Sequence, residues 1–429
     1  MPSFKLLLLQ VGTILIVTRL AGWLFGKLSQ PRVVGEMIAG IMLGPSLLGW
    51  LAPSISASLF PLASLGYLNS LSQVGLLLFM FLVGLELDLG HLRELGRAAV
   101  LISQVSIVAP FTMGFLFAAY LYPKLSGDTK SLIGFALFMG AAMSVTAFPV
   151  LARILTERKL VRTRVGSVAL ACAAVDDVTA WCILAGIVVI VRSSGGDLPI
   201  WLMAGGLVVF VLLMLFVVRR GIKRITERYE KRGGLTQDIV AIVFLVVLGS
   251  GLVTESLGVH ALFGAFVAGI VMPRHPALSR ELSQKLEAVV VVLLLPVYFA
   301  LTGLRSSFFL ISGAEMWLYC AAIIALAMMG KLGGSMLSAR VNGIPWREAA
   351  AVGILMNTRG LMELVVLNIG LDIGVISQSL FTMMVLMALI TTFMATPLSE
   401  WLYPPRVRSK ALGQPTVECA PAASASRLS

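Results

Sequence analysis

Two adjacent carboxylates lie inside one long apolar stretch of the chain. Asp176 and Asp177 fall near the centre of residues 165–192, about 18 Å from one end of that stretch if it is helical. Neighbouring helical residues point roughly 100° apart, so one carboxylate can pair with a cation of the protein while the other faces a water-filled cavity. Ionisable side chains deep in a membrane are costly and mark ion or proton pathways. The pair therefore indicates a site that binds protons or small cations reversibly.

A lysine inside another apolar stretch is the expected partner of one aspartate. Lys331 lies in residues 312–339, at about the same depth as the two carboxylates, and neighbouring glycines allow close approach of another helix. We predict that Lys331 pairs with Asp176. At a separation of about 4 Å and an effective dielectric constant of about 20, such a pair gains about 4 kcal/mol before desolvation is counted. Snorkelling of the lysine to the membrane surface is the alternative.

Two further apolar stretches contain sequence that disrupts a helix. Residues 129–154 include Ser144–Pro149, in which Pro149 removes a backbone donor. Residues 347–371 include Asn357–Gly360, a polar and flexible run. Backbone that faces lipid cannot be left unpaired, so breaks at this depth must line a protein cavity. Two ordinary kinks are the alternative interpretation.

Two charged residues accompany the second break. Arg359 and Glu363 are four residues apart and can pair on one helix face. We interpret them, together with Asn357, as structural residues that brace the break, and direct contact with an ion is the lesser alternative. Glu36 and Glu86 lie near the ends of their own apolar stretches. We expect them at the membrane interface, where they cap helices or line an access path for ions.

The composition excludes a soluble protein. Of the 429 residues, 58% are apolar and 13% are charged, against about 25% charged in soluble domains, and the mean hydropathy is +0.96. The net charge of +12 comes from basic residues in short loops, so no nucleic-acid partner is expected. The four cysteines and three histidines lack the spacing of a metal site or a disulfide framework. We predict an all-α polytopic membrane protein that is not an enzyme and has no cofactor.

The apolar stretches predict thirteen transmembrane helices, because a span needs about 20 residues. The ninth is short and separates from the eighth at Gly258, and residues 56–70 are expected to form a loop with a partial helix. The predicted spans are residues 6–25, 33–52, 71–89, 98–121, 129–154, 165–192, 199–218, 235–257, 259–273, 286–304, 312–339, 347–371 and 376–402. Residues 1–403 then form a transmembrane domain, and residues 404–429 form a short disordered tail.

The basic residues predict the orientation of these spans. Of the 33 lysines and arginines, 25 fall in the odd-numbered loops and the C-terminal tail, and 5 fall at the N-terminus and in the even-numbered loops. Cytoplasmic loops carry the excess of lysine and arginine. The N-terminus is therefore expected outside and the C-terminus in the cytoplasm. The basic loop 219–234 is expected to contact anionic lipid, with a regulatory docking site as the alternative.

The two breaks fall in the fifth and twelfth spans, which run in opposite directions. Spans 1–6 and 8–13 can then be inverted repeats with the seventh span as a connector. Paired interrupted spans in corresponding places mark the substrate site of secondary transporters. The expected fold is two inverted repeats, each with one discontinuous helix.

Several motifs together resemble the monovalent cation:proton antiporter-2 family, with Kef-type and plant CHX-like members, over the whole membrane part of the chain. The matching segments are Gly35-Glu36, Gly44–Ser46, Gly84–Asp88, Ser144–Arg153, Asp176-Asp177, Gly264–Phe266, Gly269, Lys331 and Asn357–Leu364. The resemblance implies the sodium/proton antiporter fold, in which the two discontinuous helices cross, and a homodimer in which one part of each subunit moves like an elevator. It also implies that Asp177 carries the ion, that Asp176 pairs with Lys331, and that Thr146 helps to coordinate the dehydrated cation.

The resemblance implies exchange of a monovalent cation for protons across the plasma (inner) membrane, with Na⁺ and K⁺ as the main candidates and Li⁺ as a further one. The double aspartate is associated in relatives with electrogenic exchange. Many CHX-type members carry Asn-Asp instead, so Asp176 departs from that branch. A sodium-coupled symporter for organic anions on a related fold is the main alternative. An intramembrane aspartyl protease would need its aspartates on different helices, and a passive channel would need a filter-like repeat.

Overall fold

The computed structural model describes residues 4–28, 30–86, 96–128, 131–158, 160–161, 163–194, 199–232, 234–273 and 275–403. Almost all of these residues are helical, and the described part holds one isolated β-bridge, between Ser126 and Ile376. The predicted tail 404–429 lies outside the described residues, as do Leu87 and Asp88 of one family motif.

The first half of the chain contains α1 (Phe4–Lys27), α2 (Arg32–Leu43), α3 (Leu48–Leu51), α4 (Pro53–Leu59), α5 (Leu62–Glu86), α7 (Gly96–Leu125), α8 (Leu132–Ser144), α9 (Phe148–Glu157), α10 (Arg164–Ser194), α11 (Ile200–Leu213), the π-helical segment η1 (Met214–Val218) and α12 (Arg219–Arg232). The second half contains α13 (Gln237–Ser256), α14 (Ala261–Val271), α15 (Pro276–Val289), the π segment η2 (Val290–Leu294), α16 (Leu295–Arg305), the 3₁₀ turn η3 (Phe308–Leu310), α17 (Gly313–Met328), the π segment η4 (Met329–Gly333), α18 (Gly334–Val341), α19 (Trp346–Met356), α20 (Leu361–Asp372) and α21 (Gln378–Leu402).

These elements confirm a multi-pass membrane protein. Among the described residues, eleven helical stretches are long and apolar enough to cross a membrane, and α19 with α20 forms a further span that bends by 44°. The predicted ninth span corresponds to α14, which has only 11 residues. It separates from α13 at Gly258, whose φ of +78° lies in the left-handed region that favours glycine.

Two predicted boundaries are wrong. The loop expected at 56–70 is mostly helical, because α5 begins at Leu62 rather than at residue 71. The tenth span begins at residue 276 rather than 286, where the His275 side chain caps the helix and Pro276 occupies its first turn. The added turns of α15 are polar on one face, and they bury leucines at every fourth position, Leu278, Leu282 and Leu286. A search for continuous apolar runs misses such amphipathic extensions.

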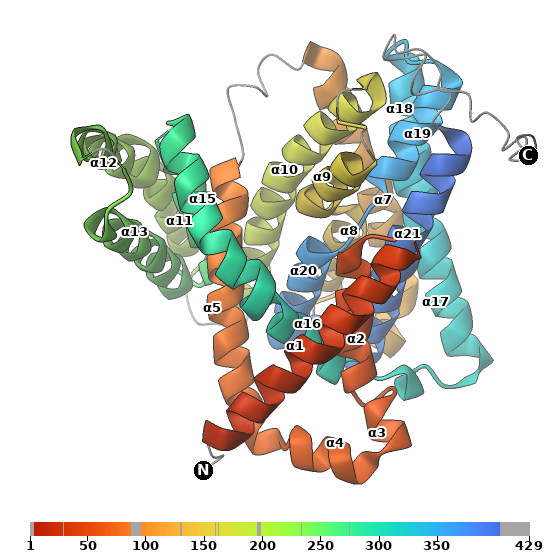
Figure 1. Ribbon diagram of the computed structural model, residues 1–429. Helices are drawn as coiled ribbons and strands as arrows, with labels where there is room; N and C mark the ends of the chain where they lie inside the picture. The colour runs from red at the N-terminus through yellow and green to blue at the C-terminus, as the bar shows by residue number, and fades with distance from the viewer. Residues whose placement is uncertain are drawn as a thin grey trace, which may run out of the picture.

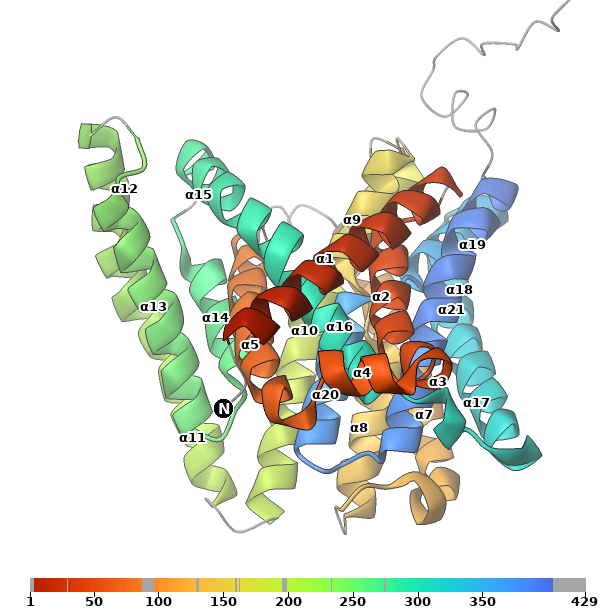
Figure 2. The same cartoon turned by 60° about the horizontal axis from the view of Figure 1, so that its bottom comes forward.

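The helices divide into two groups that lie side by side (Figures 1 and 2). We call α7–α10 with α17–α21 the site group, and α1–α5 with α11–α16 the flanking group. Within the site group α7 packs mainly on α8, whereas in the flanking group α5 packs on α14 and α2 packs on α1 and α16. In Figure 1, α9, α12, α18 and α19 reach the upper end of the bundle, which we call the basic end. The lower end, with α3 and α4, is the far end.

The two discontinuous helices cross inside the site group, as predicted. α8 and α9 run toward the basic end, whereas α19 and α20 run away from it (Figure 1). The unwound segments touch, because the amide of Ala147 donates to the carbonyl of Thr358 at 3.1 Å. Pro149 does not kink a continuous helix, since it lies in the first turn of α9, where a missing amide costs nothing. The break itself spans residues 145–147.

Glycines bring several helices of the flanking group into backbone contact. A Cβ atom on Gly303 of α16 would lie 2.0 Å from the carbonyl group of Gly40 in α2. A Cβ atom on Gly249 of α13 would meet nothing within 4 Å. Helices α2 and α16 can therefore lie this close only because Gly303 has no side chain.

We expect Gly303→Ala to force α2 and α16 apart and to cost about 1–3 kcal/mol of stability. Gly249→Ala is the matched control, which should be neutral or slightly stabilising because alanine favours a helix more than glycine does. Thermal unfolding of both variants in detergent measures the difference. Equal melting temperatures would show that the close approach is not required.

Candidate ion-binding site at the crossed helices

Five ionisable side chains are buried where α7, α10, η4 and the two breaks meet. They are Asp176, Asp177, Lys331, Arg359 and Glu363, each with at most 1% of its surface exposed. If all five are ionised, three carboxylates face two cations, and the site carries one net negative charge. One proton or one monovalent cation would neutralise it.

The predicted pair between Lys331 and Asp176 is present. The Lys331 Nζ atom lies 2.8 Å from Asp176 Oδ2, and both side chains are fully buried. Lys331 sits in the π segment η4, a local irregularity that often occurs at functional sites. η4 approaches α7 closely, because a Cβ atom on Gly330 would lie 2.7 Å from the Cα atom of Pro110. This close approach carries the ammonium group to the centre of the site group.

Asp176 is surrounded by donors. Besides Lys331, the hydroxyls of Ser103 and Ser106 on α7 donate to its two oxygens, Ser106 at 2.9 Å. The Thr146 hydroxyl, in the first break, lies 2.8 Å from Asp176 Oδ2 and 3.1 Å from the carbonyl oxygen of Met356. Sequence reasoning missed the two serines, although their spacing of three residues on an apolar helix places them on one face. Four donors therefore satisfy this carboxylate inside the protein.

The cations also hold the end of the half-helix α8, whose last carbonyls have no helical partner. Lys331 Nζ donates to the Ser144 carbonyl at 2.6 Å. The Arg359 guanidinium donates to the carbonyls of Ala142 and Met143 at 3.1 and 2.6 Å. Positive charge is favourable at this negative end of the helix dipole.

Arg359 therefore does more than brace its own break. It pairs with Glu363 at 3.2 Å, as predicted, and it also joins the second break to the first through α8. Its backbone amide donates to the Thr392 hydroxyl of α21 at 3.0 Å. Asn357 is buried in the same break, and its side-chain oxygen has no hydrogen-bond partner among the described residues.

Among the three buried carboxylates of this site, Asp177 is the one that has no ion pair in the described part of the chain. The Glu363 oxygens also lack a hydrogen bond, but Glu363 is paired with Arg359. Asp177 lies close to the backbone amide of Phe148, the first residue of α9, yet neither carboxylate oxygen has a hydrogen-bond partner in the described part of the chain. A cavity of about 10 Å³ lies beside it, enough for about one water-sized particle. The cavity is lined by Val145, Asp177, Ala180, Trp181, Leu184, Met362 and Val366. A buried carboxylate without a partner is unfavourable, so Asp177 requires a proton or a cation.

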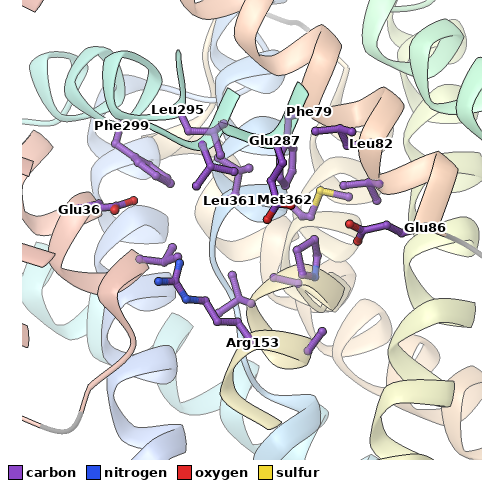
Figure 3. Close-up of a pocket in the computed structure, with 17 residues that line it drawn as sticks. Glu36, Phe79, Leu82, Glu86, Arg153, Glu287, Leu295, Phe299, Leu361 and Met362 are labelled. Atoms are coloured by element: carbon purple, nitrogen blue, oxygen red, sulfur yellow. The ribbon is translucent and has the colours of Figure 1, made fainter. Parts of the chain in front are cut away.

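A larger cavity of about 420 Å³ lies toward the basic end, between α2, α5, α9, α15 and α20. Figure 3 shows Glu36, Glu86 and Glu287 around it, with Arg153 on the opposite wall in this view. Glu36 and Glu86 thus line the same cavity as residues of the first break, and a role for them in ion access remains a prediction. The first break contributes Ala147, Pro149 and Val150 to the same wall.

At the far end, polar contacts join the two groups instead. Arg305, the last residue of α16, donates to Asp372 at 2.8 Å and to Asn368 at 3.0 Å, both on α20. Asn368 also donates to the hydroxyls of Tyr298 and Thr302 on α16, at 3.0 and 3.1 Å. The site group and the flanking group are therefore separated by a cavity at the basic end and held together at the far end.

Comparisons with known proteins agree with this geometry. Residues 14–402 match the family model described as "Sodium/hydrogen exchanger, transmembrane". The chain is 43% identical over 409 residues to the Na⁺/H⁺ antiporter NhaS4 of Synechocystis, covering 94% of this chain and 99% of the relative.

Two eukaryotic relatives are longer, and the chain spans about half of their length. It is 42% identical to Cation/H⁺ antiporter 17 of Arabidopsis thaliana and 34% identical to K⁺/H⁺ antiporter 1 of Saccharomyces cerevisiae, covering 49% and 47% of them and 94% of this chain in both cases. The solved structure of the sodium proton antiporter MjNhaP1 from Methanocaldococcus jannaschii is similar in fold, with a TM-score of 0.59, 15% identity, and coverage of 94% of this chain and 98% of that one.

We expect Lys331→Met to destabilise the protein by about 3–5 kcal/mol, because it leaves Asp176 charged and without its cation. The double variant Lys331→Met/Asp176→Asn should recover much of that loss, since no uncompensated charge remains. Thermal unfolding of the two variants beside the parent measures the coupling. If the double variant is no more stable than Lys331→Met, the pair does not control the stability of the site.

Proposed function

The chain belongs to the sodium/hydrogen exchanger family, and from this premise we propose that it exchanges Na⁺ or K⁺ for protons by alternating access, with Asp177 as the group that carries either one. The observation that carries the proposal is the buried Asp177 carboxylate, which has no hydrogen-bond partner among the described residues and lies beside a water-sized cavity. The relatives named above are cation/proton antiporters, which favours exchange over symport with an organic anion.

Competition for one carboxylate produces the coupling. With a proton on Asp177 the site is neutral and has no attraction for a cation. When the proton leaves, the carboxylate attracts one monovalent cation, which restores neutrality. The empty, charged site is unfavourable in a low-dielectric interior. The site therefore changes its access from one side of the membrane to the other only when it holds a proton or a cation. A cation carried in one direction is then exchanged for a proton carried in the other.

The residues around Asp177 provide oxygen ligands and balance the other charges of the site. Val145, in the first break, lines the cavity beside Asp177, and the hydroxyl of the next residue, Thr146, donates to Asp176. A cation bound at Asp177 would lie next to this break, whose hydroxyl and carbonyl groups are the oxygen ligands that suit Na⁺ and K⁺. Asp176 and Lys331 balance each other across the site. If cation binding weakens that pair, Lys331 releases a second proton and exchange becomes electrogenic. The membrane potential then adds about 2.3 kcal/mol per charge per 100 mV.

We place the protein as a homodimer in the plasma membrane, with the N-terminus outside and the C-terminus in the cytoplasm. The excess of lysine and arginine at the basic end supports this orientation. The cavity lined by Glu36 and Glu86 then opens toward the cytoplasm, and the contacts of Arg305 close the outer side.

The proposal predicts that Asp177→Asn abolishes exchange. Protein in liposomes with an interior pH dye and a fixed proton gradient should move protons when Na⁺, K⁺ or Li⁺ is added, and the active ion is thereby identified. Asparagine keeps the shape of the side chain but can hold neither a proton nor a balancing charge. Glu227→Gln, an exposed change on α12, is the matched control and should keep full activity.

Exchange by the Asp177→Asn variant at the parent rate would overturn the proposal. Silence of the folded parent with every cation, but sodium-driven uptake of an organic anion, would replace it with the symporter.

A further inference from the structure

We propose that Met362 is the barrier between the large cavity and Asp177, and that an ion passes it only after losing most of its water. The inference deepens the proposed function and rests on it for the identity of the ion. The cavity at the basic end and the small cavity beside Asp177 share a single lining residue, Met362, among the described residues. Figure 3 shows its side chain on the wall of the large cavity, next to Leu361. A cation or proton donor that enters at the basic end must pass this side chain to reach the carboxylate.

The backbone under Met362 is fixed. Met362 is the second residue of α20, and the preceding Gly360 adopts φ = +156° in the break. The backbone amide and carbonyl of Arg359 are both hydrogen-bonded to the Thr392 hydroxyl, at 3.0 and 2.8 Å. Glu363, which follows Met362, pairs with Arg359. Because its neighbours are held, the Met362 side chain opens or closes the path by its own rotations.

The chemistry of the methionine side chain suits a barrier to hydrated ions. A thioether has three flexible bonds and fills irregular gaps, but it is a soft group that does not attract Na⁺ or K⁺ as oxygen ligands do. Met362 is 1% exposed, and the small cavity behind it is lined also by Trp181, Leu184 and Val366. At about 10 Å³ that cavity admits about one water-sized particle. A hydrated cation is larger, so the ion must give up its water at Met362.

Labelling of a cysteine at position 177 tests the barrier without any transport measurement. The chain would carry Asp177→Cys, with its four natural cysteines (Cys172, Cys182, Cys320 and Cys419) replaced by alanine. Purified protein in detergent would be treated with 2-aminoethyl methanethiosulfonate, a small cation that reacts with thiols. Adding Met362→Ala should speed the labelling at least tenfold. Adding Met362→Leu, which keeps the bulk, should leave the rate within about twofold.

Leu82→Ala is the matched control, because Leu82 lines the large cavity only. It should not speed the labelling. The proposal is overturned if Met362→Ala has no effect, if Leu82→Ala speeds labelling as much, or if no variant is labelled. Each variant is first shown to elute as a single folded species, and a Met362→Ala protein that fails this test is replaced by Met362→Val.

A second measurement connects the barrier to selectivity. In the liposome assay Met362→Ala, with Asp177 intact, should bring the apparent KM values for Na⁺ and K⁺ closer together, because hydrated ions then enter. Met362→Leu should keep the parent ratio. An unchanged ratio in Met362→Ala would refute the dehydration step. Failure of the proposed function is recognised separately, since it would appear as silence of the parent protein.

Discussion

A helix that ends in the middle of a membrane must have its free carbonyls satisfied by the protein, and the rest of this site follows from that requirement. α8 ends at Ser144, and the three carbonyls at its end are held by Lys331 and Arg359. Two buried cations then need carboxylates, which Asp176 and Glu363 provide. Asp177 is the remaining acid, and no cation in the described part of the chain pairs with it. Under the proposed function, an external proton or cation balances its charge.

The proposed alternating access requires that the site change sides without being taken apart, and the positions of these residues suit that requirement. Lys331, Arg359, Asp176 and Glu363 all belong to the site group, so their contacts persist if that group moves as one body. The contacts between the groups are of another kind: a cavity at the basic end, and a small set of polar contacts around Arg305 and Asn368 at the far end. In the flanking group, α2 and α16 meet through Gly40 and Gly303 without intervening side chains.

The parts of the site that could be predicted from the sequence are the charged residues that lie inside apolar stretches. Lys331 had few partners of opposite charge at its depth, so its pairing with Asp176 could be anticipated. The opposite directions of the two broken helices followed from their rank among the spans, whereas their crossing was implied by the family resemblance. The contacts of Arg359 with the carbonyls of α8 could not be predicted, because every residue has a backbone carbonyl and the sequence does not indicate which ones accept a hydrogen bond from a side chain. Ser103 and Ser106 were missed because serine is common in membrane helices. The early start of α5 was missed although its first turns are apolar, because Ser64, Gly66 and Asn69 interrupt them with residue types that favour loops. The roles assigned to Asp177, Thr146 and Lys331 in ion transport remain predictions.

The central claim is that one carboxylate binds either a proton or a cation. The most direct test counts the protons released when purified, unloaded protein binds Na⁺ or K⁺ in a weakly buffered solution with a pH dye. The account predicts the release of about one proton per cation bound in acidic solution, less at higher pH where Asp177 is already ionised, and none from Asp177→Asn. Cation binding without proton release at any pH, or equal release from Asp177→Asn, would contradict it.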